Sequence, residues 1–128
     1  MREIKFRAWL LNEKRMHYID GFYDPVMSYN DEETCIIVQY TGIKDTSGKE
    51  IYDLHILNNK FIVVFYQYIV CIVDISNGDI LKKGLKRDEL EITGEYFSLP
   101  EDSKRSVDKY IRQAESAFKN QEICFAVV

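Results

Sequence analysis

One apolar run constrains the fold more than any other feature of this chain. Residues 61–73 are apolar or aromatic except for Gln67, and Lys60 and Asp74 flank them. The run is shorter than the ~20 residues that a membrane-spanning helix needs, and its β-branched content is typical of a buried strand. As one strand with its flanks it would extend about 50 Å, longer than a domain of this size is wide. We therefore expect the run to bend, to break near Gln67 or to project beyond the core.

A strand that is apolar on both faces must be covered twice. The C-terminal part offers one cover, because apolar residues there recur with helical spacing after Ser98, Pro100 and Glu101, which are typical of a helix start. These apolar residues are Val107, Tyr110, Ile111, Ala114 and Phe118. They predict one amphipathic helix over about residues 102–119.

A single helical stripe is too narrow to shield the whole run, so association with a second subunit is the simplest completion. We predict a homo-oligomer whose interface is drawn from the apolar run, with a contribution from the tail. The predicted interface residues are Phe61, Val63, Phe65, Tyr66, Tyr68, Val70 and Ile72.

The rest of the chain has the two-residue alternation of β-strands. Residues 4–8 place Ile4, Phe6 and Ala8 on one face and Lys5 and Arg7 on the other. Residues 15–19 are expected to return along this strand as a hairpin. Further strands are predicted at residues 34–40, 50–57 and 79–81, with turns at Asn58-Asn59 and Asn77-Gly78, and a terminal strand at 122–128.

These elements fit a single domain spanning residues 1–128, long enough to bury about two thirds of the surface of its unfolded chain. The predicted fold is mainly β: a small meander or partly closed, barrel-like sheet over residues 2–97. One C-terminal amphipathic helix and a terminal strand follow it.

The stretch GIKDTSGKE, residues 42–50, superficially looks like a phosphate-binding loop. Five residues rather than four separate Gly42 from Gly48, and Glu50 stands where a P-loop has a hydroxyl. The segment that follows also looks extended rather than helical. We therefore interpret the stretch as a tight turn between two strands, in which Gly48 supplies a positive φ.

Two motifs in order give the chain a distinctive resemblance. The opening MREIKFRAW (residues 1–9), followed by QYTGIKD (39–45) with GKEIY (48–52), resembles the YopX family of small phage and prophage proteins. A weaker match is ITGEYF (92–97) before LPE, so the resemblance covers about residues 1–101. Leu54 and His55 depart from it, because the family typically has Gly and Asp there, and Glu95 replaces an Asn. The resemblance implies a mainly β fold and a phage or prophage origin, and it transfers no reaction.

Charge decides little about nucleic acids. The formal charge of −4 gives no global attraction to phosphate, so binding would need a local basic surface. A candidate basic patch comprises Lys5, Arg7, Arg15, Lys82, Lys83, Lys86 and Arg87. Neutralisation of the second cluster by Asp88, Glu89 and Glu91 is the simpler interpretation.

No catalytic, cofactor or metal site is predicted. The two histidines, His17 and His55, have no metal-ligand spacing, and a Cys71–His55 dyad has only residue type in its favour. The three cysteines (35, 71 and 124) lie in apolar runs and form no C-x-x-C pair. Their odd number and the charged N-terminus lead us to expect no signal peptide and a reducing cytoplasm in a bacterial host.

The expected function is that of a non-enzymatic phage or prophage accessory protein, an oligomeric protein-interaction module with a host or phage protein as partner. The alternative is a nucleic-acid-binding accessory protein.

Overall fold

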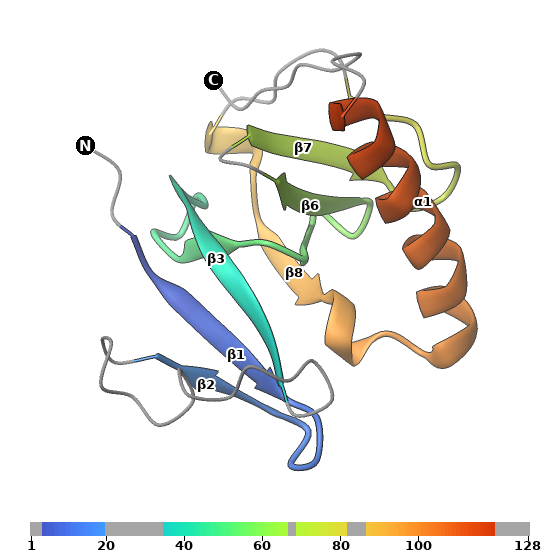
Figure 1. Cartoon of the computed structure of the whole chain (residues 1–128). Coiled ribbons are helices and arrows are strands. Elements are labelled where there is room, and N and C mark those ends of the chain that lie inside the picture. Colours follow the sequence, from blue (N-terminus) through green and yellow to red (C-terminus); the bar gives the residue numbers. More distant parts are fainter. Residues whose placement is uncertain (1–3, 20–34, 67–68, 82–86, 120–128) are drawn as a thin grey trace.

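Two four-stranded antiparallel sheets and one long helix make up the fold (Figure 1). The computed structural model describes residues 4–19, 35–66, 69–81 and 87–119. The first sheet has the order β2-β1-β3-β4 and contains β1 (Phe6–Leu10), β2 (Arg15–Tyr18), β3 (Cys35–Lys44) and β4 (Glu50–Tyr52). The second has the order β7-β6-β5-β8 and contains β5 (His55–Leu57), β6 (Phe61–Tyr66), β7 (Ile69–Asp74) and β8 (Ile92–Glu95). Two 3-10 helices, η2 (Arg87–Glu89) and η3 (Tyr96–Ser98), precede α1 (Glu101–Lys119). The mainly β fold with one C-terminal helix is confirmed.

The long apolar run breaks near Gln67, one of the three outcomes expected from its length. It forms the antiparallel pair β6–β7, in register from Phe61 opposite Asp74 to Tyr66 opposite Ile69. The pair therefore spans about half the length of a single strand. Two shorter strands fit within a small sheet, and this removes the need for a segment that projects beyond the core.

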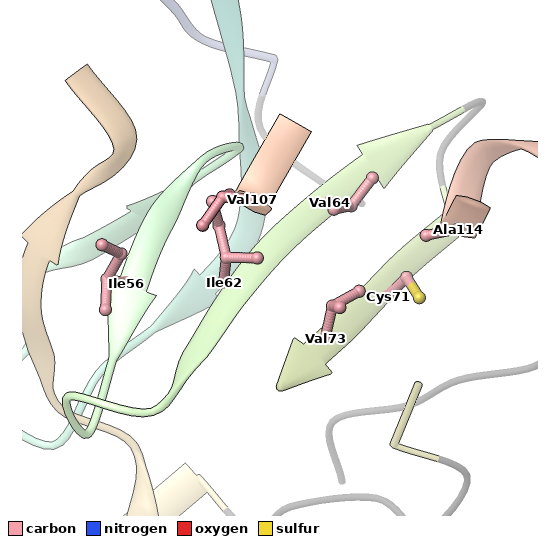
Figure 2. Close-up of a cluster of buried hydrophobic side chains, with 7 residues drawn as sticks. All are labelled: Ile56, Ile62, Val64, Cys71, Val73, Val107 and Ala114. Atoms are coloured by element: carbon pink, nitrogen blue, oxygen red, sulfur yellow. The ribbon is translucent and has the colours of Figure 1, made fainter. Parts of the chain in front are cut away.

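The helix α1 covers one face of this pair. Figure 2 shows Val107 and Ala114 of α1 facing Ile62 and Val64 of β6 and Cys71 and Val73 of β7. All six side chains are buried, together with Ile56 of β5. Tyr110 and Ile111 pack against the same cluster, so four of the five residues of the predicted stripe lie against the sheet. The side chain of the fifth, Phe118, lies outside the described part of the structure.

The opposite face of the pair is covered by other parts of the same chain. Val63 and Ile72 pack there with Leu57, with Ile51 of β4 and with Leu90. Val63 and Ile72, predicted as interface residues, are thus core residues of the monomer, at 0% and 2% exposed. A second subunit is not needed to cover the hairpin in the described part of the chain, and Tyr68 lies outside that part. The homo-oligomer stays a prediction, without the argument from an uncovered strand.

The first strand differs from its prediction in one important respect. The alternation is present, but Arg7 is only 5% exposed instead of facing solvent. The reason is that β1 lies between β2 and β3 and is buried on both faces, with Ala8 and Leu10 on the side opposite Arg7. The face that carries Arg7 and Trp9 is the one that packs toward Phe97 and the second sheet.

The turn between β3 and β4 confirms the interpretation of GIKDTSGKE, although β3 extends to Lys44, so that Gly42 lies in the strand. Gly48 has φ 83°. The carboxylate of Asp45 accepts hydrogen bonds from the backbone N–H groups of Ser47 and Lys49, both at 2.9 Å, and of Ile92 at 3.2 Å. Burial opposes ionisation of Asp45, but these three hydrogen bonds outweigh it and hold its pKa below the usual value. The backbone N–H groups that a phosphate-binding loop would donate to phosphate are thus hydrogen-bonded to an aspartate of the chain itself.

The other local predictions are confirmed only in part. Asn58 and Asn59, each at φ 55°, form the turn from β5 to β6, and Gly78 at φ 80° forms the turn after β7. The returning strand predicted at 79–81 is reduced to one bridge between Ile80 and Val73. The strand predicted at 50–57 is two strands, one in each sheet. Ser98 lies in η3 rather than capping α1, and the predicted terminal strand lies outside the described residues.

Candidate functional site

A cavity of about 480 Å³ lies where the two sheets meet. This volume falls in the range of small-molecule binding sites. The first sheet supplies most of its wall, and the second sheet supplies two residues. The lining residues are Arg7, Tyr18, Lys44, Gly48, Lys49, Glu50, Tyr52, His55 and Ile92.

A sharp turn brings two neighbouring segments of the chain, the end of β4 and the start of β5, to the cavity. β4 ends at Tyr52, Leu54 takes φ 69°, and β5 begins at His55 in the other sheet. The turn brings the His55 ring back toward β4, where Nδ1 accepts a hydrogen bond of 2.9 Å from the backbone N–H of Tyr52. This bond fixes the orientation of the imidazole and leaves Nε2 facing Arg7.

The guanidinium of Arg7 is buried beside this ring. It lies over the ring of Tyr52 at 4.3 Å and 5.7 Å from the ring centre of Tyr18, distances typical of cation–π contacts. The nearest carboxylate is that of Glu95, whose Oε2 is 3.6 Å from Nη2. The buried Nε of Arg7 has no hydrogen-bond partner, the one such side-chain nitrogen or oxygen in the described residues. A buried N–H without an acceptor is costly, so the burial of this guanidinium is only partly compensated by hydrogen bonds.

The contact between Arg7 and His55 brings two hydrogen-bond donors together. Because Nδ1 of His55 accepts from Tyr52, the proton of the neutral ring is on Nε2. Nη2 of Arg7 lies 3.2 Å from that Nε2, and a guanidinium cannot accept a hydrogen bond. Both N–H groups therefore need an acceptor from elsewhere. An oxygen that carries negative charge, placed beside both, satisfies them.

His55 stays neutral in this setting. Burial, reinforced by the positive charge of Arg7 and opposed by Asp45, lowers the pKa of His55 from 6.5 to about 4. At neutral pH the ring therefore offers one donor, Nε2–H, and its only acceptor atom is already occupied. This arrangement suits hydrogen bonding to an anion, whereas a general base needs a free nitrogen lone pair.

The cavity rim is also cationic. Lys44 at the end of β3 and Lys49 in the turn both line it. Among the described residues of the lining, the one carboxylate is that of Glu50, which forms an ion pair of 2.6 Å with Lys5. The lining therefore favours a negatively charged ligand.

The family comparison agrees with the motifs at residues 39–52 and 92–101, whereas the opening motif at residues 1–9 lies before the matched region. The sequence model of one family, described as YopX protein, matches residues 23–102, more than half of the chain. The chain belongs to the YopX family. No curated protein matches it significantly.

Three residues depart from the YopX motif, and one of them, His55, lines this cavity. Leu54 stands where the family typically has Gly, and its φ of 69° is a conformation that favours glycine. The turn is thus formed despite the substitution. His55, at the typical Asp position, and Glu95, at the typical Asn position, both contact Arg7. These two departures are therefore parts of one cluster around a single guanidinium.

The basic patch predicted from the sequence is only partly assembled. Arg7 lines the cavity and Lys5 pairs with the lining residue Glu50, whereas Arg15 pairs with Glu13 at 2.6 Å in the exposed β1–β2 hairpin. Lys82, Lys83 and Lys86 lie outside the described residues, and Arg87 begins η2.

Sequence reasoning missed the contributions of Tyr18, Lys44, Lys49, Tyr52 and His55 to one site. The signal for most of them was that Lys44, Lys49 and Tyr52 lie within the family motifs and that His55 is a departure just after them.

The Cys71–His55 dyad is not assembled. Cys71 is buried beneath α1, and burial raises the pKa of its thiol to about 12, so it is not a ready nucleophile. His55 instead lines the cavity at the sheet junction. Within the described ranges, no group of three or more His, Cys, Asp or Glu residues is placed to hold a metal ion. In the same ranges, no helix has the length and apolar character needed to cross a membrane.

Proposed function

We propose that this YopX-family protein is a phage or prophage accessory protein that acts in the bacterial cytoplasm by binding rather than by catalysis. In this proposal the cavity at the sheet junction recognises an anionic group of the binding partner. The observation that carries it is the 3.2 Å contact between Arg7 Nη2 and His55 Nε2. Since Nδ1 of His55 accepts from Tyr52 N–H, we infer that both of these atoms are donors and that neither satisfies the other.

The titratable groups support binding over catalysis. A catalytic histidine usually has a pKa near the working pH, whereas that of His55 is about 4. The hydrogen bond from Tyr52 N–H to Nδ1 makes His55 a poor base and also holds its Nε2–H in position to donate to an anion. The ring therefore needs no reorganisation when the ligand binds.

Two earlier expectations stand apart from this proposal. Homo-oligomerisation stays a prediction that multi-angle light scattering checks, and the anion site does not depend on it. An extended nucleic-acid surface gains little support from the described part of the chain, because Lys5 and Arg15 are paired with carboxylates and Arg7 is buried.

An NMR titration tests the proposal. Inorganic phosphate and sulfate are added to the ¹⁵N-labelled protein at constant ionic strength, with chloride as the reference. We expect shifts concentrated at the amides around Tyr52, His55 and Gly48. Shifts scattered over surface lysines, or none up to tens of millimolar, would contradict the proposal.

A matched pair of variants sharpens the test. Arg7→Gln removes the buried cation and should abolish the response, whereas Arg15→Gln removes an exposed arginine of the same sheet and should leave it unchanged. Because loss of Arg7 can disturb folding, Lys49→Gln at the exposed rim provides a second measurement. It should weaken binding several-fold while the spectrum stays that of a folded protein.

A further inference from the structure

We propose that the ligand of this cavity is a 5′-phosphorylated nucleotide, with its phosphate between Arg7 and His55 and its base against Tyr18. This inference rests on the anion site proposed above and names the ligand class. Three features carry it: the number of donors, the space and the exposed aromatic ring.

Donors line the cavity from several elements. Arg7 comes from β1 and offers Nη2, and His55 comes from β5. Lys44 and Lys49 approach from the β3–β4 hairpin. A phosphate monoester has three terminal oxygens pointing in different directions, whereas a carboxylate has two in one plane. Donors that converge from three elements therefore match phosphate better.

The cavity is larger than phosphate alone requires. A volume of about 480 Å³ is of the size that holds a whole small molecule. Gly48 contributes open wall, since a Cβ added there would meet nothing within 4 Å. The remainder of a ligand bound by its phosphate thus has room along the hairpin.

Tyr18 indicates what the rest of the ligand is: a flat group that stacks on an aromatic ring. Although it lines the cavity, 65% of its surface is exposed, which is unusual for a large aromatic side chain. The neighbouring Tyr52 is 2% exposed, and its ring is already covered by the guanidinium of Arg7. Tyr18 also contacts Arg7, 5.7 Å from its ring centre, and makes a T-shaped contact with Tyr52, but its exposed surface leaves room for a base to stack. Exposed aromatic rings next to cationic grooves are a common way to bind nucleotides, because every base has a flat π-face.

Glu95 sets the affinity of the site. Its carboxylate, 3.6 Å from Arg7 Nη2, is the negative charge that an incoming phosphate must share or displace. Removing that charge should tighten phosphate binding, whereas removing the charge of the exposed Glu13, which pairs with Arg15, should have no effect. Glu95→Gln and Glu13→Gln are thus a matched pair.

Calorimetric titrations of the full chain compare adenosine 5′-monophosphate, ribose 5-phosphate, adenosine and an acetylated glutamate peptide at fixed ionic strength. The nucleotide should bind at least about fivefold more tightly than ribose 5-phosphate, the ratio expected from stacking on one aromatic ring. Tyr18→Leu should bring this ratio close to one and leave the affinity for ribose 5-phosphate unchanged. Glu95→Gln should tighten the binding of both phosphates, and Glu13→Gln should not.

The outcomes separate the two proposals. Equal binding of the nucleotide and ribose 5-phosphate would overturn the nucleotide inference and leave the anion site standing. Tighter binding of the glutamate peptide than of the nucleotide would also overturn the nucleotide inference and leave the anion site standing. Failure of every anion to bind would overturn both. A 5′-phosphorylated and a 5′-hydroxyl oligonucleotide distinguish the source: preference for the phosphorylated strand over the free nucleotide supports a strand end, and the reverse supports a free nucleotide.

Discussion

Acid should destabilise the protein through His55, and His55→Gln should remove this effect. The pKa of His55 is about 4 in the folded protein, against 6.5 for a model histidine. A group whose folded pKa is depressed contributes stability above the unfolded value, and this stability is lost as pH falls from 6.5 through 4. At 1.36 kcal/mol for each pKa unit, the loss reaches about 3 kcal/mol at pH 4.

The difference between the two proteins isolates this contribution. Asp53 has the opposite dependence, because burial raises its pKa to about 7, despite a hydrogen bond from Phe65 N–H, and folding then favours its neutral form at low pH. Other carboxylates also titrate in the same range. These dependences are common to both proteins and cancel in the difference, as does the constant cost of losing the imidazole.

Urea unfolding followed by the fluorescence of Trp9, which stacks on Phe97 with ring centres 5.0 Å apart, supplies the free energies from pH 7.5 to 4. The stability of the wild type relative to His55→Gln should fall by about 3 kcal/mol over this range. A difference that stays constant with pH would refute the buried, neutral histidine.

Two further comparisons test the turns. Gly78→Ala should lower the free energy of unfolding by at least about 2 kcal/mol, because φ is 80° and the new Cβ would overlap the ring of Tyr110. Gly48→Ala, at φ 83° in open space, should lower it by only about 1 kcal/mol, measured by thermal or urea unfolding. In the same assay, Asn58→Gly should lower the free energy of unfolding by about 1–2 kcal/mol, because the side-chain amide of Asn58 forms hydrogen bonds with the backbone of Glu89 and Glu91. Asn59→Gly, at the same φ of 55°, should stay within about 0.5 kcal/mol of the wild type. Equal losses within either pair of variants would contradict these assignments.

The fold was largely predictable because its signals are local. Alternation, the asparagine and glycine turns and the helical stripe identified most strands and the helix. Alternation specifies two faces of a strand but not which face is inside, and in β1 both are buried. The charged side chain of Arg7 therefore suggested solvent, although the second sheet covers it.

The site was not predictable because it depends on contacts between distant residues. Arg7 and His55 are 48 positions apart, and their meeting depends on the turn at Leu54 that carries the chain from one sheet to the other. β8 escaped detection for the same reason, since its pairing with β5 is set by tertiary structure. The predicted oligomer interface depended on treating the apolar run as one strand, and the break near Gln67 removed that argument.

The most direct test of the account is the protonation state of His55. Nitrogen-15 NMR of the histidine rings, assigned with His55→Gln, reports which ring nitrogen carries the proton at pH 7. The account predicts a neutral ring protonated at Nε2, whose Nε2–H resonance moves when phosphate is added. A ring protonated at Nδ1 and insensitive to phosphate would contradict it, because Nε2 would then accept from Arg7 and no anion would be needed.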